Sequence, residues 1–153
     1  MRTQTSSVLT EMRHDPRADT VPRSSDTTWY AIRGATTVER DERDEILAAT
    51  RDLLERIRVD NRLSIGDIVS AFFVVTRDLT AAYPAEAARQ LGWTDTALLC
   101  ASDMDVAGSL KRCIRVLMHV CMQRSPQAVR HVYLEKAASL RPDWSKRAAL
   151  EHE

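Results

Sequence analysis

The segment KRCIRVLMHVCM, residues 111–122, is the most informative part of this chain. Successive side chains of a β-strand point to opposite faces of a sheet, so the segment divides into two sets. One set is wholly apolar and comprises Ile114, Val116, Met118 and Val120. The other set mixes Cys113, Arg115, Leu117, His119 and Cys121. The pattern predicts a strand with one face against a hydrophobic core, and the other against a second subunit or a polar pocket.

Strands and helices alternate in the segments around this strand. Apolar residues at three- and four-residue spacing predict a helix over Glu39–Val59. The nearly continuous apolar run Ile68–Val75 predicts a strand buried on both faces. Further elements are predicted as strands over Trp29–Ala35, Thr96–Cys100 and His131–Ala138, a helix over Pro84–Leu91 and one helical turn over Ser125–Val129. The order predicts an α/β or α+β domain with about five strands.

The two ends of the chain differ in composition from the part between them. Residues 1–28 are rich in Ser and Thr, and Pro16 and Pro22 interrupt any helix. Such a segment buries too little apolar surface to offset its ordering entropy. We therefore expect a disordered or extended N-terminal arm over 1–28, one folded domain over 29–145 and a flexible C-terminal tail over 146–153.

Composition excludes several classes of partner. The chain has 153 residues, 44% of them hydrophobic, and 22 basic residues balance 22 acidic ones. Nucleic acid is an improbable partner because a duplex-binding protein needs a basic surface to displace counterions from phosphates. The sequence also predicts no membrane-spanning helix, since no apolar run approaches the roughly 20 residues that such a helix needs. Three unpaired cysteines and no secretion signal predict a cytoplasmic protein.

Motifs for the commonest chemistries are missing from the sequence. It contains no GxGxxG, GxxxxGK[ST] or GxSxG motif, and neither its cysteines nor its histidines have zinc-ligand spacing. We therefore expect no metal and no cofactor. Cys100 could act as a nucleophile with His119 or His131 as its base, but the sequence supplies no geometry for that pair. Cys113 and Cys121 are interpreted as small packing residues.

Arginines inside apolar strands are the strongest chemical signal. Arg33 and Arg115 lie among aliphatic residues, where an unpaired guanidinium would be costly. Each could form a salt bridge, or they could bind a dianionic small molecule together with Arg141. Tyr133 is either a core aromatic or a pocket wall with a polar tip. Asp103 and Asp105 flank Met104 in a predicted turn: either one of them accepts a hydrogen bond from a substrate hydroxyl, or both lie in a solvated turn.

Taken together, several short motifs resemble one family. The run IRGATTVE, residues 32–39, is similar to the opening signature of the AroH-type chorismate mutases, which are monofunctional enzymes. The resemblance covers about residues 29–145. It continues, in order and at matching spacing, through DL (78–79), YPA (83–85), MDV (104–106), CIRV (113–116), RHVYL (130–134) and LRPD (140–143).

The resemblance implies both an assembly and a reaction. Members of this family are homotrimers in which mixed sheets from the subunits form a pseudo α/β barrel with helices outside it. Their active sites lie between neighbouring subunits. The implied reaction is the Claisen rearrangement of chorismate to prephenate, a step of the shikimate pathway in aromatic amino-acid biosynthesis. It is pericyclic, so it needs no covalent intermediate and no cofactor.

The resemblance also implies a role for individual residues. Arg115 would donate to the ether oxygen, where negative charge grows in the transition state. Arg33 and Tyr133 would hold the side-chain carboxylate, and Cys100 would lie beside the ring hydroxyl. The remaining residues complete the cleft: Tyr83, Ala85 and Leu140 would form walls, and Arg89 and Arg141 would line the entrance under the C-terminal tail.

Two positions differ from the family pattern. Asp103 stands where the family commonly has a glutamate, and Glu86 stands where better-known members have a lysine. The shorter carboxylate would lower activity or favour an analogue such as 4-amino-4-deoxychorismate, unless the backbone restores its reach. Glu86 would make the entrance less attractive to a dianion. A further alternative is a catalytically weak, anion-binding or interaction protein on the same trimeric scaffold.

Overall fold

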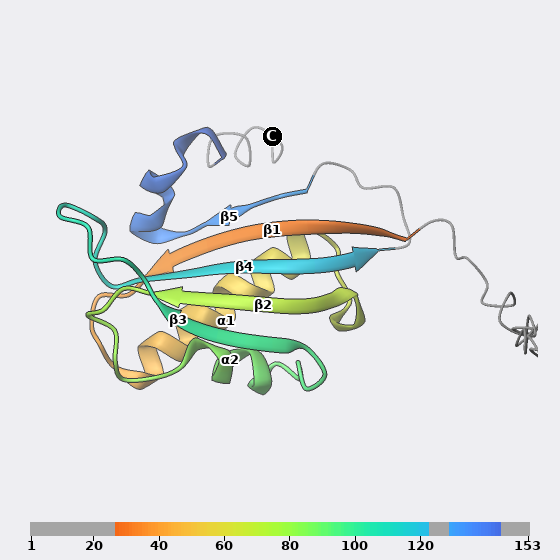
Figure 1. The fold of residues 1–153 in the computed structure, drawn as a ribbon, viewed down its shortest axis with the longest axis horizontal. Coiled ribbons are helices and arrows are strands. Elements are labelled where there is room, and N and C mark those ends of the chain that lie inside the picture. The colour runs from red at the N-terminus through yellow and green to blue at the C-terminus, as the bar shows by residue number, and fades with distance from the viewer. Residues whose placement is uncertain (1–26, 123–128, 145–153) are drawn as a thin grey trace, which may run out of the picture.

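A mixed β-sheet covered on one face by two helices forms the body of this chain (Figure 1). The computed structural model describes residues 27–122 and 129–144. Within them, the sheet has five strands in the order β3-β2-β4-β1-β5. The elements are β1 (Thr28–Thr37), α1 (Arg43–Asp60), the 3₁₀ helix η1 (Ile65–Asp67), β2 (Ile68–Val75), α2 (Pro84–Gln90), β3 (Ala97–Ser102), β4 (Cys113–Met122), β5 (Val132–Tyr133) and the 3₁₀ helix η2 (Glu135–Leu140).

The central strand β4 has the two-faced character that its sequence predicts. It pairs antiparallel with β1 on one side and with β2 on the other. Four of its apolar side chains lie on the face that α1 and α2 cover, and each is at most 3% exposed: Ile114, Val116, Met118 and Val120. The other face, called the uncovered face below, is covered by neither α1 nor α2, although η2 packs on part of it, where Ala137 clusters with Ala35 and Cys113.

Helix α1 packs along this sheet with the residues that its periodicity predicts. Its buried side chains include Ile46, Leu53, Leu54 and Ile57. The helix begins later than the predicted Glu39, because the backbone N–H groups of Glu39 and Arg40 donate to the Glu45 carboxylate at 2.6 and 3.2 Å. Residues before Arg43 are thereby held in a non-helical conformation.

Gly34 in β1 allows α1 to approach the sheet closely. A Cβ at this position would lie 2.7 Å from Ile57 Cδ1, which is closer than Cβ atoms pack, and 3.2 Å from Val116 Cγ1, which is tight. Neighbouring residues of a strand point to opposite faces, so Arg33 and Ala35 project away from α1 onto the uncovered face. A glycine thus sets the position of the strand that carries Arg33.

Two features of the predicted fold are wrong in detail. Strand β2 is not buried on both faces: Val69 is 37% and Phe72 is 39% exposed, because both helices lie on the same side of the sheet. The predicted strand His131–Ala138 is paired only over Val132–Tyr133. Glu135 adopts a φ of 49°, a left-handed conformation that ends the strand and starts η2.

Some expectations fall on residues that the structure does not describe. The proposed arm lies almost wholly within residues 1–26, and the proposed tail and most of the turn at Ser125–Val129 lie within 145–153 and 123–128. These predictions are therefore outside the described residues.

Candidate active site

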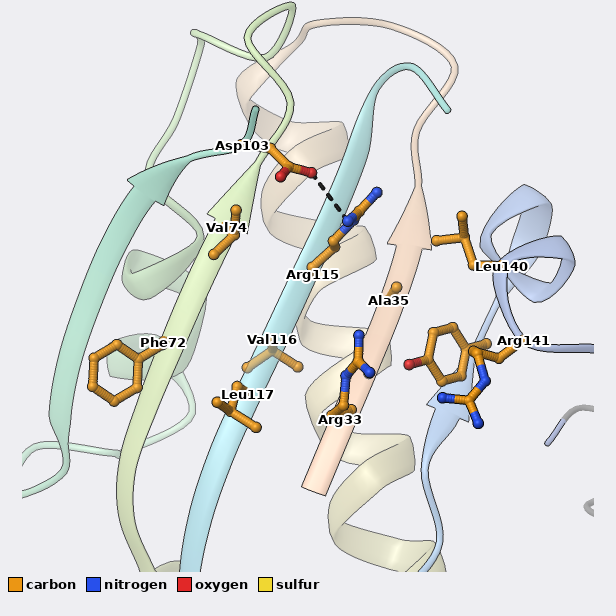
Figure 2. Close-up of a pocket in the computed structure, with 12 residues that line it drawn as sticks. Arg33, Ala35, Phe72, Val74, Asp103, Arg115, Val116, Leu117, Leu140 and Arg141 are labelled. Atoms are coloured by element: carbon orange, nitrogen blue, oxygen red, sulfur yellow. Dashed lines mark ion pairs between the residues drawn. The ribbon is translucent and has the colours of Figure 1, made fainter. Parts of the chain in front are cut away.

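A cavity of about 520 Å³ opens on the uncovered face of the sheet (Figure 2). This volume is typical of pockets that bind small molecules. Its walls come from β1, β2, β4, β5, the end of η2 and the residue after β3. The lining residues are Arg33, Gly34, Ala35, Phe72, Val74, Asp103, Arg115, Val116, Leu117, Tyr133, Leu140 and Arg141.

Positive charge dominates this cavity. Arg33, Arg115 and Arg141 line it with a single carboxylate, that of Asp103. Figure 2 shows Arg33 on β1, Arg115 on the neighbouring strand β4 and Arg141 beyond η2. Guanidinium groups bind carboxylates through paired N–H donors, so a small dianion with two carboxylates suits this arrangement.

Arg115 forms an ion pair with the carboxylate that lines the cavity. Its Nη1 lies 3.2 Å from Asp103 Oδ2, and the two side chains are 34% and 18% exposed. Its Nε is buried without a hydrogen-bond partner. The Arg115 side chain also interacts with the buried Cys113 thiol. Because Arg115 lines the cavity, its guanidinium can donate to a ligand oxygen there.

Asp103 is held at the rim by its own backbone. Its N–H donates to the Val75 carbonyl at 2.8 Å, which fixes the residue to the end of β2. Its Oδ1 accepts the Met104 N–H at 2.9 Å, while Oδ2 meets Arg115. The aspartate side chain is therefore long enough for its carboxylate to reach Arg115, without the extra methylene of a glutamate.

Tyr133 and His131 present neutral groups at the β1–β5 edge. Burial raises the pKa of the Tyr133 phenol above its ordinary value of 10, although the nearby Arg33 and Arg141 charges oppose this. The phenol therefore stays protonated and can donate a hydrogen bond. Burial, and secondly the charges of Arg33 and Arg141, lower the pKa of His131 below 6.5. The neutral ring accepts the Arg33 N–H at Nδ1, 3.0 Å away.

The structure separates the predicted site residues into two groups. Six of them line the cavity: Arg33, Asp103, Arg115, Tyr133, Leu140 and Arg141. The other four do not: Tyr83, Ala85, Arg89 and Cys100. The second group lies on α2, on the residue before it and on β3, which is the strand at the opposite edge of the sheet from β5.

The second group is a mixture of exposed and packed residues. Tyr83 is 72% exposed, and Arg89 is also exposed. Ala85 is buried in the core, and Cys100 packs against the same core from β3. The Cys100 side chain pairs in register with Phe73, on the helix-covered face. One chain alone therefore does not bring it to the cavity.

Glu86 is not the unpaired negative charge that the sequence suggests. Its carboxylate forms an ion pair with Arg43 at the start of α1 and accepts a hydrogen bond from Gln90. The pair raises the pKa of the Arg43 guanidinium above its ordinary value. The local charge is therefore balanced, and the expected repulsion of a dianion by Glu86 is largely compensated.

Sequence reasoning missed the apolar part of the cavity. Phe72 and Val74 are paired with Leu117 and Arg115 across β2 and β4, so all four project onto the uncovered face. The nearly continuous apolar run Ile68–Val75 gave no signal for which of its side chains face the cavity. Trp144, which contacts several cavity residues, follows directly on the LRPD motif and gave no separate signal.

Neither a metal cluster nor a membrane span is found among the described residues. In 27–122 and 129–144, no three His, Cys, Asp or Glu side chains come together as candidate ligands. In the same ranges, each helix is too short or too polar to cross a bilayer.

Comparison with known proteins identifies the family. The family model "Chorismate mutase type I" matches residues 29–144. The chain belongs to the type I chorismate mutase family. It is 50% identical over 115 residues to chorismate mutase AroH of Bacillus subtilis, which covers 74% of this chain and 91% of that protein. It is 48% identical over 113 residues to chorismate mutase AroH of Thermus thermophilus, which covers 73% and 93%.

The fold agrees with this family. A solved chorismate mutase from Clostridium thermocellum matches with a TM-score of 0.69 and 51% identity, covering 72% of this chain and 98% of that structure. The predicted AroH-type resemblance, and the five-stranded mixed sheet with helices outside it, are confirmed. The chain is a chorismate mutase, an isomerase of aromatic amino-acid biosynthesis.

Proposed function

We propose that the cavity rearranges chorismate to prephenate and that Arg115 is its principal catalytic residue. Support comes mainly from the convergence of Arg33, Arg115, Arg141 and Tyr133 around one cavity with a single carboxylate. Chorismate carries two carboxylates, so it matches the excess of guanidinium groups. Its size is also appropriate for a cavity of about 520 Å³.

Catalysis here rests on conformer selection and on electrostatics. Arg115 and Tyr133, with Arg33, hold the substrate in the compact conformer in which the reacting carbons approach each other, while Arg141 binds it at the entrance. As the ether bond breaks, negative charge grows on its oxygen, and the Arg115 guanidinium stabilises that charge. Asp103 accepts a hydrogen bond from the ring hydroxyl. Its ion pair with Arg115, at 3.2 Å, also holds the guanidinium in place. Because the Arg115 interaction strengthens in the transition state, it raises turnover rather than affinity alone.

The working site is completed by a neighbouring copy in a cytoplasmic homotrimer. The four predicted residues outside the cavity lie at the β3 edge, whereas the cavity lies toward β1 and β5. A ring of copies brings the β3 edge of one subunit to the cavity of the next. The uncovered face of the sheet supports this assembly, since Phe72, Leu99 and Leu117 are 39%, 55% and 37% exposed in a single chain.

Purified protein mixed with chorismate tests the proposal. Loss of the diene absorbance gives the rate, and NMR identifies the product. We expect prephenate at a rate far above the spontaneous one, and a fall of about 100- to 1000-fold or more in Arg115→Ala. Arg56→Ala is the matched control, because Arg56 pairs with Asp60 on α1. No acceleration by the assembled wild type would contradict the proposal, and 4-amino-4-deoxychorismate would then be tried.

A further inference from the structure

Trp144 contacts four groups at the mouth of the cavity. Its ring lies 4.0 Å from the His131 ring, centroid to centroid, with an interplanar angle of 29°. The Tyr133 ring is 5.6 Å away and tilted by 47°. The Cζ atom of Arg141 lies 3.2 Å from the indole centroid, and that of Arg33 lies 5.9 Å from it. One indole therefore adjoins two of the three guanidiniums of the cavity.

The indole restricts the Arg141 side chain. Arg141 also forms a two-point ion pair with Asp143, with Nε–Oδ1 at 3.0 Å and Nη2–Oδ2 at 2.8 Å. A guanidinium held by a carboxylate and an aromatic face has few rotamers left. Arginine side chains carry about 2 kcal/mol of rotamer entropy, so a preordered arginine loses less on binding a ligand.

The His131 ring connects the indole to strand β1. It stacks on Trp144 and accepts the Arg33 backbone N–H at Nδ1, 3.0 Å away. His131 precedes β5, whereas Trp144 follows η2. The stack therefore joins the segment after η2 to the strand that carries Arg33. The His131 and Tyr133 rings thus fix the indole against β1 and β5, and the Arg141 guanidinium, from the same segment as Trp144, lies over the indole.

We propose that Trp144 is a positioning residue that holds Arg141, and secondarily Arg33, toward the cavity and thereby sets the affinity for the dianionic substrate. This inference rests on the proposed function. Groups that bind the substrate carboxylates equally in ground and transition states lower KM and leave kcat unchanged. Arg115 is not among the groups that contact Trp144. Loss of the indole therefore raises KM with little effect on kcat.

Steady-state kinetics of Trp144→Leu and Trp144→Phe test this. We expect Trp144→Leu to raise KM for chorismate by about 5- to 30-fold, from the strength of cation–π contacts, with kcat within about twofold of wild type. Trp144→Phe keeps an aromatic face and should recover most of the loss. Lys136→Ala is the matched control, because Lys136 lies on η2 and pairs with Glu39 outside the cavity.

Fluorescence supplies a second readout that does not depend on turnover. Prephenate binding beside Trp144 should change the intrinsic emission of the wild type. The change should disappear in Trp144→Phe, which retains Trp29 and the buried Trp93. This comparison also decides the matter if Trp144→Leu fails to fold, as circular dichroism would show.

The outcomes separate this inference from the proposed function. A wild type that does not accelerate the reaction overturns the proposed function and this inference with it. An active wild type overturns the inference alone if Trp144→Leu has an unchanged KM, or if it loses kcat instead. An emission change that persists in Trp144→Phe overturns it as well.

Discussion

Replacing Asp103 by Asn removes one charge from the centre of the cavity and keeps the shape of the side chain. The carboxylate now lies 3.2 Å from Arg115 Nη1. Two unit charges at 3.2 Å interact by about 1.3 kcal/mol in bulk water and by about 5 kcal/mol at the effective dielectric of a protein surface. The side chains are 34% and 18% exposed, so the true value lies between these limits.

An asparagine oxygen still accepts hydrogen bonds, which reduces the loss further. We therefore expect Asp103→Asn to cost about 2–3 kcal/mol of transition-state stabilisation, or about 30- to 150-fold in kcat/KM. The chorismate absorbance assay measures it directly. Asp103→Glu restores the charge on a longer stem and should stay within about tenfold of wild type.

Asp105 provides the matched control in the same loop. Its carboxylate pairs with Lys111 at 3.3 Å, and both side chains are more than half exposed. Asp105→Asn should therefore change kcat/KM by less than about twofold. The reasoning is refuted if Asp103→Asn and Asp105→Asn behave alike, because the enclosed ion pair would then contribute nothing to catalysis.

Three further predictions concern stability and assembly. Gly34→Ala should lower the free energy of unfolding by about 1–3 kcal/mol, since the new methyl meets α1, and urea denaturation would reveal an unchanged midpoint if this is wrong. Because the pKa of His131 is lowered from 6.5, the unfolded chain binds a proton that the folded chain refuses, so stability should fall as pH drops through 6.5 toward the folded pKa. A His131→Gln variant with the same pH dependence in chemical denaturation would argue against this. Leu99→Asp places a charge on the uncovered face and should reduce the mass in sedimentation from trimer toward monomer; an intact trimer would contradict the proposed contact.

Elements with a complete periodic pattern could be predicted from the sequence. The alternation in residues 111–122 gave β4 and its two faces, and the spacing from Ile46 to Ile57 gave the buried side of α1. The end of β5 could not be predicted, because it depends on a left-handed Glu135 that local composition does not favour. Periodicity likewise cannot show that both helices cover the same face of the sheet. For that reason β2 was predicted to be buried on both faces.

The candidate site divides in the same way. Arg33 and Arg115 stand out because a charge inside an apolar strand needs a partner. The contacts of Trp144 depend on the meeting of β1, β5 and the segment after η2, which no local pattern records. The orientation of Cys100 toward the core depends on the register of β3 with β2, a property of the assembled sheet.

The most direct test of a site shared between subunits is complementation of two inactive variants. The proposed site has two halves: the cavity of one subunit, and the residues of α2 and β3 from its neighbour. Arg115→Ala inactivates the first half, and Arg89→Ala inactivates the second. Co-expressed in equal amounts, the two should form mixed trimers in which about a quarter of the interfaces combine two intact halves. The account predicts that the mixture regains about a quarter of the wild-type kcat per site, whereas each variant alone stays far below it. A mixture no more active than the mean of the two variants would contradict it.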